Sequence, residues 1–189
     1  GEFYFAKFLE TGKSIETIIP GIIYKLVSEF PWPKSQRWGT SKMSWVRPLH
    51  KINVVLDGNL LKGNLDLGGG MNIRYSNVGY GHSFYHEQGF KISSFNSYVS
   101  KMRELDVLVD SEERKNVILN SASQLAKQKG LQLRSDEELL DEVIGLVEYP
   151  NVLCGKIDNK FMVLPDEVLV TSMRVHQKYF ALENENKKI

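Results

Sequence analysis

The chain has 189 residues, of which 42% are hydrophobic and 25% charged, so it is long enough to bury a core and ordinary in composition for a globular protein. Its 24 Lys and Arg nearly balance its 23 Asp and Glu, so overall charge does not indicate nucleic-acid binding, and any such surface must be a local patch. The single cysteine, Cys154, excludes an internal disulfide and a cysteine-based zinc site, and no apolar run approaches the roughly 20 residues of a membrane span. We therefore expect a cytoplasmic protein without a membrane partner.

The N-terminal part is predicted to combine a strand with an apolar helix. Residues 3–9 are aromatic and β-prone, which predicts a strand. Ser14 can cap the following helix, although Pro20 suggests that the regular helix begins only there. Its apolar stripe recurs at helical spacing and comprises Ile18, Ile19, Ile22, Ile23, Leu26, Val27 and Phe30. The prolines of residues 31–33 end this helix.

An irregular segment follows in which arginine and tryptophan lie side by side. Arg37 and Trp38 are adjacent, and Arg47 follows Trp45 closely. A guanidinium can hold a phosphate with two hydrogen bonds and an indole can stack on an unpaired base, so this pattern suits RNA. In the alternative, both tryptophans anchor the core and both arginines pair with acidic neighbours.

Two turns are predicted in the glycine-rich middle of the chain. Residues 52–61 form a hairpin around Asp57-Gly58. The triplet at residues 68–70 is a turn or a bulge and not a phosphate loop, because no Gly-Lys-Ser/Thr follows and no helix opens there.

His82 and His86 are four residues apart, but glycines and aromatics argue against a helix and no third ligand is near, so we predict no metal site.

The second half is predicted to be mainly helical. A helix over residues 92–105 points Phe95, Val99 and Met102 inward, and residues 107–109 form a buried strand. The next helix opens at a capping box of Asp110 with Glu113 and ends at Gly130.

A further helix opens at a capping box of Ser135 with Glu138 and ends at residues 148–150. Its apolar positions are Leu139, Leu140, Val143, Ile144 and Val147. Residues 152–155 and 160–163 then read as a second hairpin around Asp158-Asn159.

The last element is a helix that starts near Pro165, with acidic residues in its first turn, followed by a short strand over residues 179–182. Arg174 and Lys178 are one turn apart and can present two cations to one partner. One face collects Val168, Leu169, Ser172, Met173 and His176. In the alternative this is an ordinary core helix with a solvated arginine.

Interleaved helices and hairpins together predict a single α+β domain over residues 1–189, with a mixed or antiparallel sheet and several packed amphipathic helices.

Four motifs resemble, in order, the beta subunit of bacterial two-subunit glycyl-tRNA synthetase. They are Phe30-Pro31-Trp32-Pro33-Lys34-Ser35-Gln36-Arg37-Trp38-Gly39; Gly81-His82-Ser83-Phe84; Leu139-Leu140-Asp141-Glu142-Val143 with Glu148-Tyr149-Pro150; and Leu164-Pro165-x-Glu167-Val168-Leu169 followed by Thr171-Ser172-Met173-Arg174-x-His176-Gln177-Lys178-Tyr179-Phe180. The resemblance covers nearly the whole chain. Since the family's subunit extends beyond both ends of it, we expect a fragment.

The resemblance implies a role in attaching glycine to its tRNA. In the family, the alpha subunit carries the catalytic site that uses ATP, and the beta subunit supplies much of the tRNA contact. We therefore expect glycine tRNA, the alpha subunit and the rest of the beta subunit as partners, with no cofactor, catalytic residue or metal in this fragment. The candidate RNA-binding residues are Arg37, Trp38, Arg47, His82, Arg174, His176, Gln177 and Tyr179.

Two other roles stay open. The central part of the family's beta subunit is similar in outline to the editing-type domain of the phenylalanyl-tRNA synthetase beta subunit, and a deacylase would use His82, Glu148 and His176 as acid–base candidates. A small amino acid such as glycine leaves less need for editing, because the active site can exclude larger side chains. A structural module that holds the subunits together would instead show an apolar patch on its surface.

Overall fold

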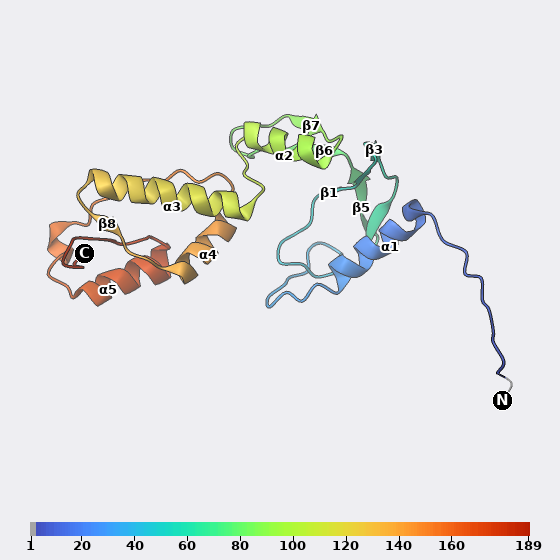
Figure 1. The fold of residues 1–189 in the computed structure, drawn as a ribbon, viewed down its shortest axis with the longest axis horizontal. Coiled ribbons are helices and arrows are strands. Elements are labelled where there is room, and N and C mark those ends of the chain that lie inside the picture. Colours follow the sequence, from blue (N-terminus) through green and yellow to red (C-terminus); the bar gives the residue numbers. More distant parts are fainter. Residues whose placement is uncertain (1–2) are drawn as a thin grey trace. The chain divides into compact units, whose positions relative to one another are not determined.

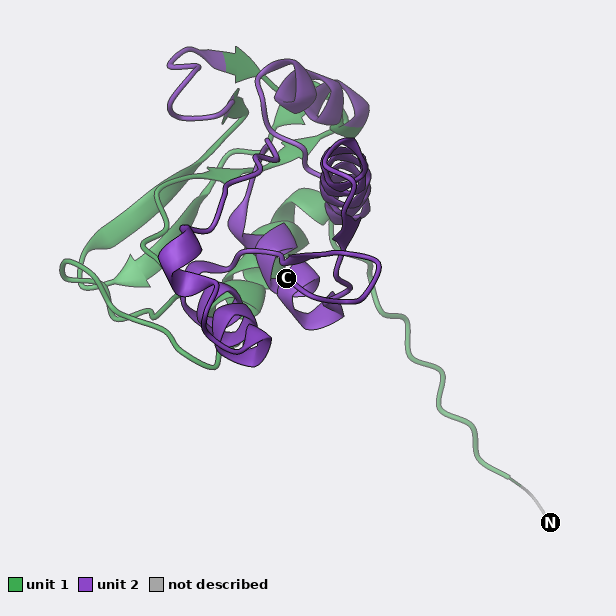
Figure 2. Cartoon of the chain, turned by 90° about the vertical axis from the view of Figure 1, so that its left-hand side faces the viewer, with its two compact units in different colours: residues 1–79, 90–95 green, residues 80–89, 96–189 purple. Residues whose placement is uncertain are grey.

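A computed structural model describes residues 3–189 (Figure 1). The chain divides into two compact units, drawn in green and purple in Figure 2. Unit 1 comprises Gly1–Gly79 and Phe90–Phe95, and unit 2 comprises Tyr80–Gly89 and Asn96–Ile189. The single domain expected from the sequence stays a prediction.

Unit 1 begins with an extended segment and one helix. Residues 3–14 have no regular structure, so the strand predicted over residues 3–9 is wrong in this chain. Helix α1 (Ile15–Ser28) follows Ser14, whose Oγ lies 2.9 Å from Thr17 Oγ1 and caps no backbone N–H. Pro20 lies inside the helix and does not start it, which corrects the predicted boundary. The helix tolerates this proline because Ile19, Ile23 and Val27 pack on the core.

A small mixed sheet forms the centre of unit 1. Strand β5 (Met71–Ser76) pairs antiparallel with β4 (Asn64–Gly68) and parallel with β1 (Ile52–Asn53), which gives the order β1-β5-β4. Between β4 and β5 the register shifts, and residues 68–70 all have positive φ. The predicted glycine turn is therefore confirmed, whereas the two strands beside it were not foreseen.

The hairpin predicted over residues 52–61 is shorter than expected. Strand β2 (Val55–Leu56) pairs antiparallel with β3 (Asn59–Leu60). Asp57 and Gly58, with φ of 47° and 78°, make the turn, as two-residue hairpin loops require. Strand β1 leaves this hairpin and joins β5 instead, so only the inner part of the prediction is confirmed.

The core of unit 1 lies between α1 and the β4–β5 pair. Strand alternation puts Leu65, Leu67, Ile73 and Tyr75 on the buried face, and Leu65 is only 1% exposed. The other buried members are Val27, Met43, Val54 and Leu61. Trp38 and Trp45 pack against this cluster, so their alternative role as core anchors is confirmed.

A two-stranded sheet of β6 (Val78–Tyr80) and β7 (Gly89–Lys91) contains two of the points where the chain passes between the units. Helix α2 (Phe95–Glu104) follows. Met102 is buried as predicted, but Phe95 is 73% exposed, so its predicted inward orientation is wrong. Residues 107–109 form no strand, although Val107 and Leu108 are buried and the Leu108 N–H donates to the Glu148 carbonyl at 2.9 Å.

Unit 2 is built around two packed helices, α3 (Ser111–Gln128) and α4 (Glu137–Leu146). Ile118, Leu140 and Ile144 form their shared core, with Leu119, Val143, Val147 and Phe180 against it. Asp110 caps α3 by accepting the Glu112 N–H at 2.9 Å. The cap of α4 is Asp136 and not the predicted Ser135, because the Asp136 carboxylate accepts the Leu139 N–H at 3.0 Å.

The C-terminal part returns to this helix pair. The second predicted hairpin is wrong: residues 151–158 are irregular and are followed by a 3-10 helix, η1 (Asn159–Phe161). Helix α5 (Asp166–Thr171) continues directly into a π-helix, η2 (Ser172–Gln177). Strand β9 (Leu182–Glu183) then pairs antiparallel with β8 (Gln132–Leu133).

The helices and small sheets of the two units confirm the predicted α+β class. None of the helices in residues 3–189 has the length and apolar character needed to cross a membrane.

Candidate nucleic-acid interface

The eight candidate RNA-binding residues are divided between the two units. Arg37, Trp38 and Arg47 lie in unit 1, and the other five lie in unit 2, namely His82, Arg174, His176, Gln177 and Tyr179. The convergence of the two groups on one surface stays a prediction.

In unit 1, a two-way backbone bridge holds the arginine segment. The Gln36 N–H donates to the Trp45 carbonyl at 2.8 Å, and the Trp45 N–H donates back to Gln36 at 3.0 Å. Arg37 and Arg47 flank this bridge, and both are exposed. Neither forms an ion pair with an acidic side chain of residues 3–189, so the alternative in which both are neutralised is wrong. Their guanidinium groups remain available to an anionic partner.

Three aromatic rings pack against one another beside the arginine segment. The ring centroids of Phe30 and Trp32 are 4.5 Å apart, those of Trp32 and Trp45 are 5.0 Å apart, and those of Phe30 and Trp45 are 5.4 Å apart. Such tilted and edge-on pairs add to the free energy of burial. Trp38 packs on the core beside them. Because these rings hold one another in place, the backbone between Trp32 and Trp45, which carries Arg37, is held in place as well.

The charge of the chain is unevenly distributed. Residues 30–56 contain no Asp or Glu, and their cations are Lys34, Arg37, Lys42, Arg47 and Lys51. Unit 1 as a whole has 11 Lys and Arg against six Asp and Glu, whereas unit 2 has 13 against 17. A near-neutral total therefore hides a basic unit and an acidic one. Counting charge in windows along the sequence would have revealed this signal, which the overall count conceals.

In unit 2, His82 lies in a tight turn that is fixed to the end of α2. Its N–H donates to the Leu105 carbonyl at 2.8 Å, and its Nδ1 accepts the Phe84 N–H at 3.3 Å. His86 Nε2 lies 2.8 Å from Asp106 Oδ2, which holds the other end of the turn. Among residues 3–189, no group of three His, Cys, Asp or Glu is placed to hold a metal ion.

Gly81 is required for this turn because a side chain has no room there. A Cβ at residue 81 would lie 2.3 Å from Leu105 Cβ and 2.6 Å from the Leu105 carbonyl oxygen. We expect Gly81→Ala to lower the free energy of unfolding by about 1–3 kcal/mol, as overpacked sites do. Urea denaturation measures this change. Gly145→Ala in α4 is the control: its Cβ meets nothing within 4 Å, so it should leave stability unchanged or raise it. Equal effects of the two substitutions would contradict the explanation.

Arg174 joins the π-helix to the start of α4. Its Nε donates to Asp136 Oδ2 at 2.5 Å, its Nη2 donates to Asp136 Oδ1 at 3.3 Å, and Nη2 also bonds Glu138. The hydrogen bond from Arg174 lowers the pKa of Asp136 despite partial burial, and both carboxylates raise the pKa of Arg174. One turn on, Lys178 Nζ donates to Glu142 at 2.8 Å. The two cations expected to face one partner therefore both bind acidic residues of α4.

The π-helix exposes the remaining candidates. π-helices are rare and occur often at functional sites. Lys178 ends the element with φ of 57°, and the Tyr179 N–H reaches back to the Met173 carbonyl at 3.0 Å. His176, Gln177 and Tyr179 are all exposed, so His176 does not belong to a buried core face, as the alternative of an ordinary core helix would require. The π-helix interrupts the 3.6-residue period on which the shared face of Val168, Leu169, Ser172, Met173 and His176 depended.

Asp136 has two roles that substitutions can separate. Asparagine caps a helix as well as aspartate, so Asp136→Asn should remove only the charge paired with Arg174, whereas Asp136→Ala should cost about 1 kcal/mol more through the lost cap. Because its pKa is lowered on folding, ionised Asp136 contributes stability above its ordinary pKa of about 3.9, and this contribution is lost as pH falls through the lowered value. The stability difference between wild type and Asp136→Asn should therefore shrink in acid. Urea unfolding at pH 7 and pH 3 measures it, and a constant difference would contradict the pairing.

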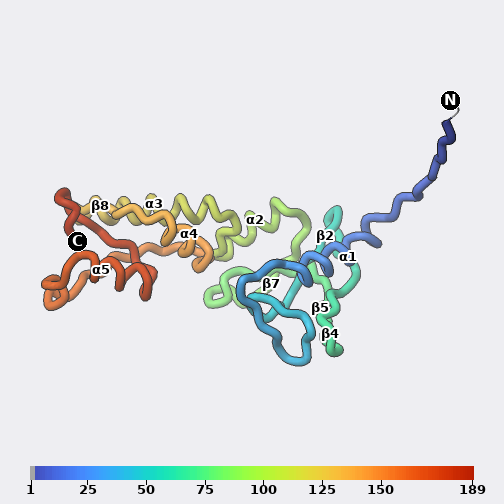
Figure 3. The backbone as a smooth tube through the Cα atoms, turned by 90° about the horizontal axis from the view of Figure 1, so that it is seen from below, coloured from blue at the N-terminus to red at the C-terminus, as the bar shows by residue number. Residues whose placement is uncertain are grey.

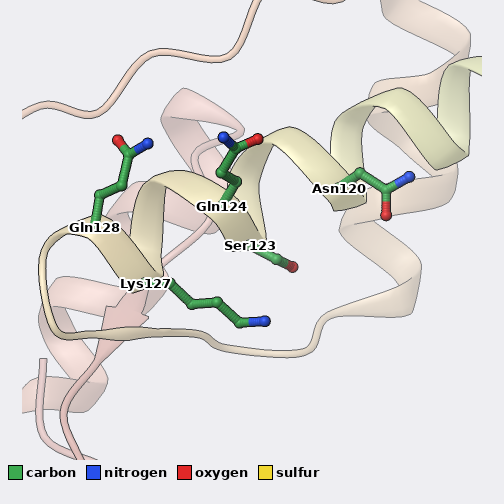
Figure 4. Close-up of a pocket in the computed structure, with 5 residues that line it drawn as sticks. All are labelled: Asn120, Ser123, Gln124, Lys127 and Gln128. Carbon is green, nitrogen blue, oxygen red and sulfur yellow. The ribbon is translucent and has the colours of Figure 1, made fainter.

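The acid–base candidates of a deacylase do not meet at the polar depression on α3 (Figure 4). The residues that line it are Asn120, Ser123, Gln124, Lys127 and Gln128. His82, Glu148 and His176 are not among them. Amide, hydroxyl and ammonium groups without a carboxylate or imidazole offer no general base, so this depression gives no support to hydrolysis.

The chain is similar in sequence to known proteins over its whole length. Residues 1–189 match the family described as glycyl-tRNA synthetase beta subunit. The glycine–tRNA ligase beta subunit of Rhodospirillum centenum is 42% identical over 208 residues, which cover 100% of this chain and 29% of that protein. Those of Paracoccus denitrificans and Rickettsia felis are 38% and 37% identical, over 97% and 95% of this chain and 27% and 26% of their own lengths. The chain thus spans less than a third of these relatives.

Proposed function

The chain belongs to the glycyl-tRNA synthetase beta subunit family, and we propose that it is a tRNA-binding part of a cytoplasmic glycine–tRNA ligase. In this proposal the alpha subunit carries out the ATP-dependent attachment of glycine. This chain contributes contacts to glycine tRNA and has no catalytic residue of its own. Its partners are glycine tRNA, the alpha subunit and the remainder of the beta subunit.

One observation carries the proposal: Arg37 and Arg47 are exposed and unpaired within residues 3–189, in a segment without a single acidic residue. Elsewhere in the chain, Arg103 and Arg174 bind carboxylates. A guanidinium that no carboxylate neutralises, on a loop fixed by packed indoles, is suited to phosphate. RNA offers such phosphates along its whole backbone, and these contacts position a protein without reading sequence.

A second group of contacts is proposed at the π-helix. Arg174 is held by Asp136, so in this proposal it fixes the π-helix to α4 and orients the exposed residues that follow it. Gln177 can donate and accept hydrogen bonds, and the Tyr179 ring, which is 61% exposed, can stack on an unpaired base. Arg174 then acts as a positioning residue, and the RNA contacts come from His176, Gln177 and Tyr179.

Titration of the chain with glycine tRNA and with an unrelated tRNA, at two salt concentrations, tests this function. We expect the chain to bind glycine tRNA and the affinity to fall as salt rises, because each phosphate contact releases counterions. An absence of binding at low salt would contradict the proposal and favour a purely structural role.

That structural role, as a module holding the ligase together, has an observation of its own. Large apolar side chains are exposed along α1 and in the segment before it, including Ile22 and Leu26. Exposed apolar surface of this extent marks interaction sites. It is compatible with tRNA binding, since the two features involve different residues of unit 1.

A further inference from the structure

Residues 3–9 have the side chains of a buried strand but none of its contacts. Phe3, Tyr4, Phe5, Phe8 and Leu9 are between 83% and 98% exposed. No main-chain hydrogen bond within residues 3–189 involves this segment. In Figures 1 and 3, the dark-blue chain before α1 runs beside no other segment of unit 1. Seven residues of this kind leave a row of unpaired N–H and C=O groups beside apolar side chains.

The sequence of this segment would put apolar side chains on both faces of a strand. Successive side chains of a β-strand point to opposite faces, so a strand formed here would carry Phe3 and Phe5 on one face and Tyr4 on the other. An edge strand of a two-layer fold buries one face only, whereas a strand with apolar residues on both faces is typical of a position covered on both sides. Lys7 is its only charged residue.

The helix that follows carries a second uncovered surface. Ile19, Ile23 and Val27 face the core of unit 1. Ile18, Ile22 and Leu26, each one position before these, form an adjoining stripe and are 41%, 57% and 60% exposed. The predicted broad stripe of α1 is therefore real, but this unit covers only half of it.

We propose that residues 3–9 are a β-strand that pairs with an open strand edge in the part of a longer beta subunit outside these 189 residues, and that the same region covers the outer stripe of α1. The inference rests on the proposed function, in which the chain is part of such a subunit. The partner is defined by its chemistry: a strand with free main-chain groups, flanked by apolar side chains.

The length of the relatives favours this occupant. The matched region is 29% of the Rhodospirillum centenum subunit, so most of a subunit of that size lies outside it. A strand in the same polypeptide is present at a high effective concentration, which a separate partner lacks. A second copy is a poorer fit, because its strand meets residues 3–9 only at the concentration of the free chain.

Amide hydrogen exchange tests the proposal in the full-length beta subunit that contains this sequence, with the 189-residue chain as comparison. We expect the amides of residues 3–9 to exchange at least about 100-fold more slowly in the full-length subunit, because stable strands open rarely. Ala6→Pro should remove this protection in the full-length subunit, because proline lacks the N–H that a paired strand needs. Gly12→Ala, where a Cβ meets nothing within 4 Å, should leave it unchanged.

Three results would overturn the proposal. They are equal exchange rates in both proteins, protection that appears in the 189-residue chain as its concentration rises, and protection that requires the alpha subunit. The second would identify another copy of this chain as the occupant, and the third would identify the alpha subunit. Exchange reports the strand whether or not tRNA binds, so failure of this proposal is distinguishable from failure of the proposed tRNA contact.

Discussion

Replacing both Arg37 and Arg47 with alanine is expected to weaken the binding of glycine tRNA about 100-fold, because a hydrogen bond to a charged group is worth about 1.5 kcal/mol or more, or roughly tenfold in affinity for each residue. Both side chains are exposed and have no acidic partner in residues 3–189, so their removal breaks no ion pair of the described fold. The slope of log affinity against log salt should also become shallower by roughly 1.5, since two phosphate contacts are lost. A filter-binding or anisotropy titration at several salt concentrations measures both quantities.

The control changes the same charge elsewhere. Lys101 and Lys160 are exposed but paired with Glu104 and Asp158. Replacing both with alanine should alter tRNA affinity less than about threefold, because surface ion pairs of this kind contribute little to stability and these lysines already have partners. If the two double variants weaken binding equally, net charge and not the arginine segment is responsible.

Leu140→Ala is expected to lower the free energy of unfolding by about 2–5 kcal/mol, the range found for leucines that leave a cavity in a core. Leu140 of α4 is 1% exposed and forms one core cluster with Ile144 of the same helix and Ile118 of α3. Its removal loosens the helix whose N-cap residue, Asp136, holds Arg174. Denaturant unfolding followed by circular dichroism measures the loss.

Leu146→Ala on the same helix is the matched control for this loss. Leu146 is 61% exposed, so its truncation removes little buried surface and should change stability by no more than about 0.5 kcal/mol. A small effect at Leu140, or a large one at Leu146, would show that α4 packs differently.

Local signals in the sequence predicted three helices. The apolar stripes predicted α1 and α4, and the cap at Asp110 together with Gly130 predicted α3. The residue that caps a helix is harder to predict where two suitable polar residues are adjacent. Ser135 and Asp136 could each cap α4, and it is the Asp136 carboxylate that accepts the Leu139 N–H.

Tertiary partners determined the rest of the fold. Strands β4 and β5 went unpredicted because glycine and asparagine obscure the alternation of Leu65, Leu67, Ile73 and Tyr75. Residues 152–163 resemble a hairpin in composition, yet Leu153 and Val163 are 85% and 84% exposed. Within residues 3–189 nothing covers them, so β-propensity alone forms no strand.

The candidate site shows the same limit. Sequence reasoning singled out Arg174 for its charge, but Asp136 lies 38 positions away and no local pattern connects the two. The available cations instead lie near the aromatic motif, at Arg37 and Arg47, where the alternative had assigned them acidic partners.

Cross-linking of bound glycine tRNA to the assembled ligase, followed by mass spectrometry of the linked peptides, tests the central claim most directly. We expect the cross-links in this chain to fall within residues 30–56 and at residues 176–179. They should disappear from residues 30–56 in the Arg37→Ala/Arg47→Ala variant. Cross-links confined to other parts of the ligase, with none in these two segments, would contradict the account and leave the chain a structural module.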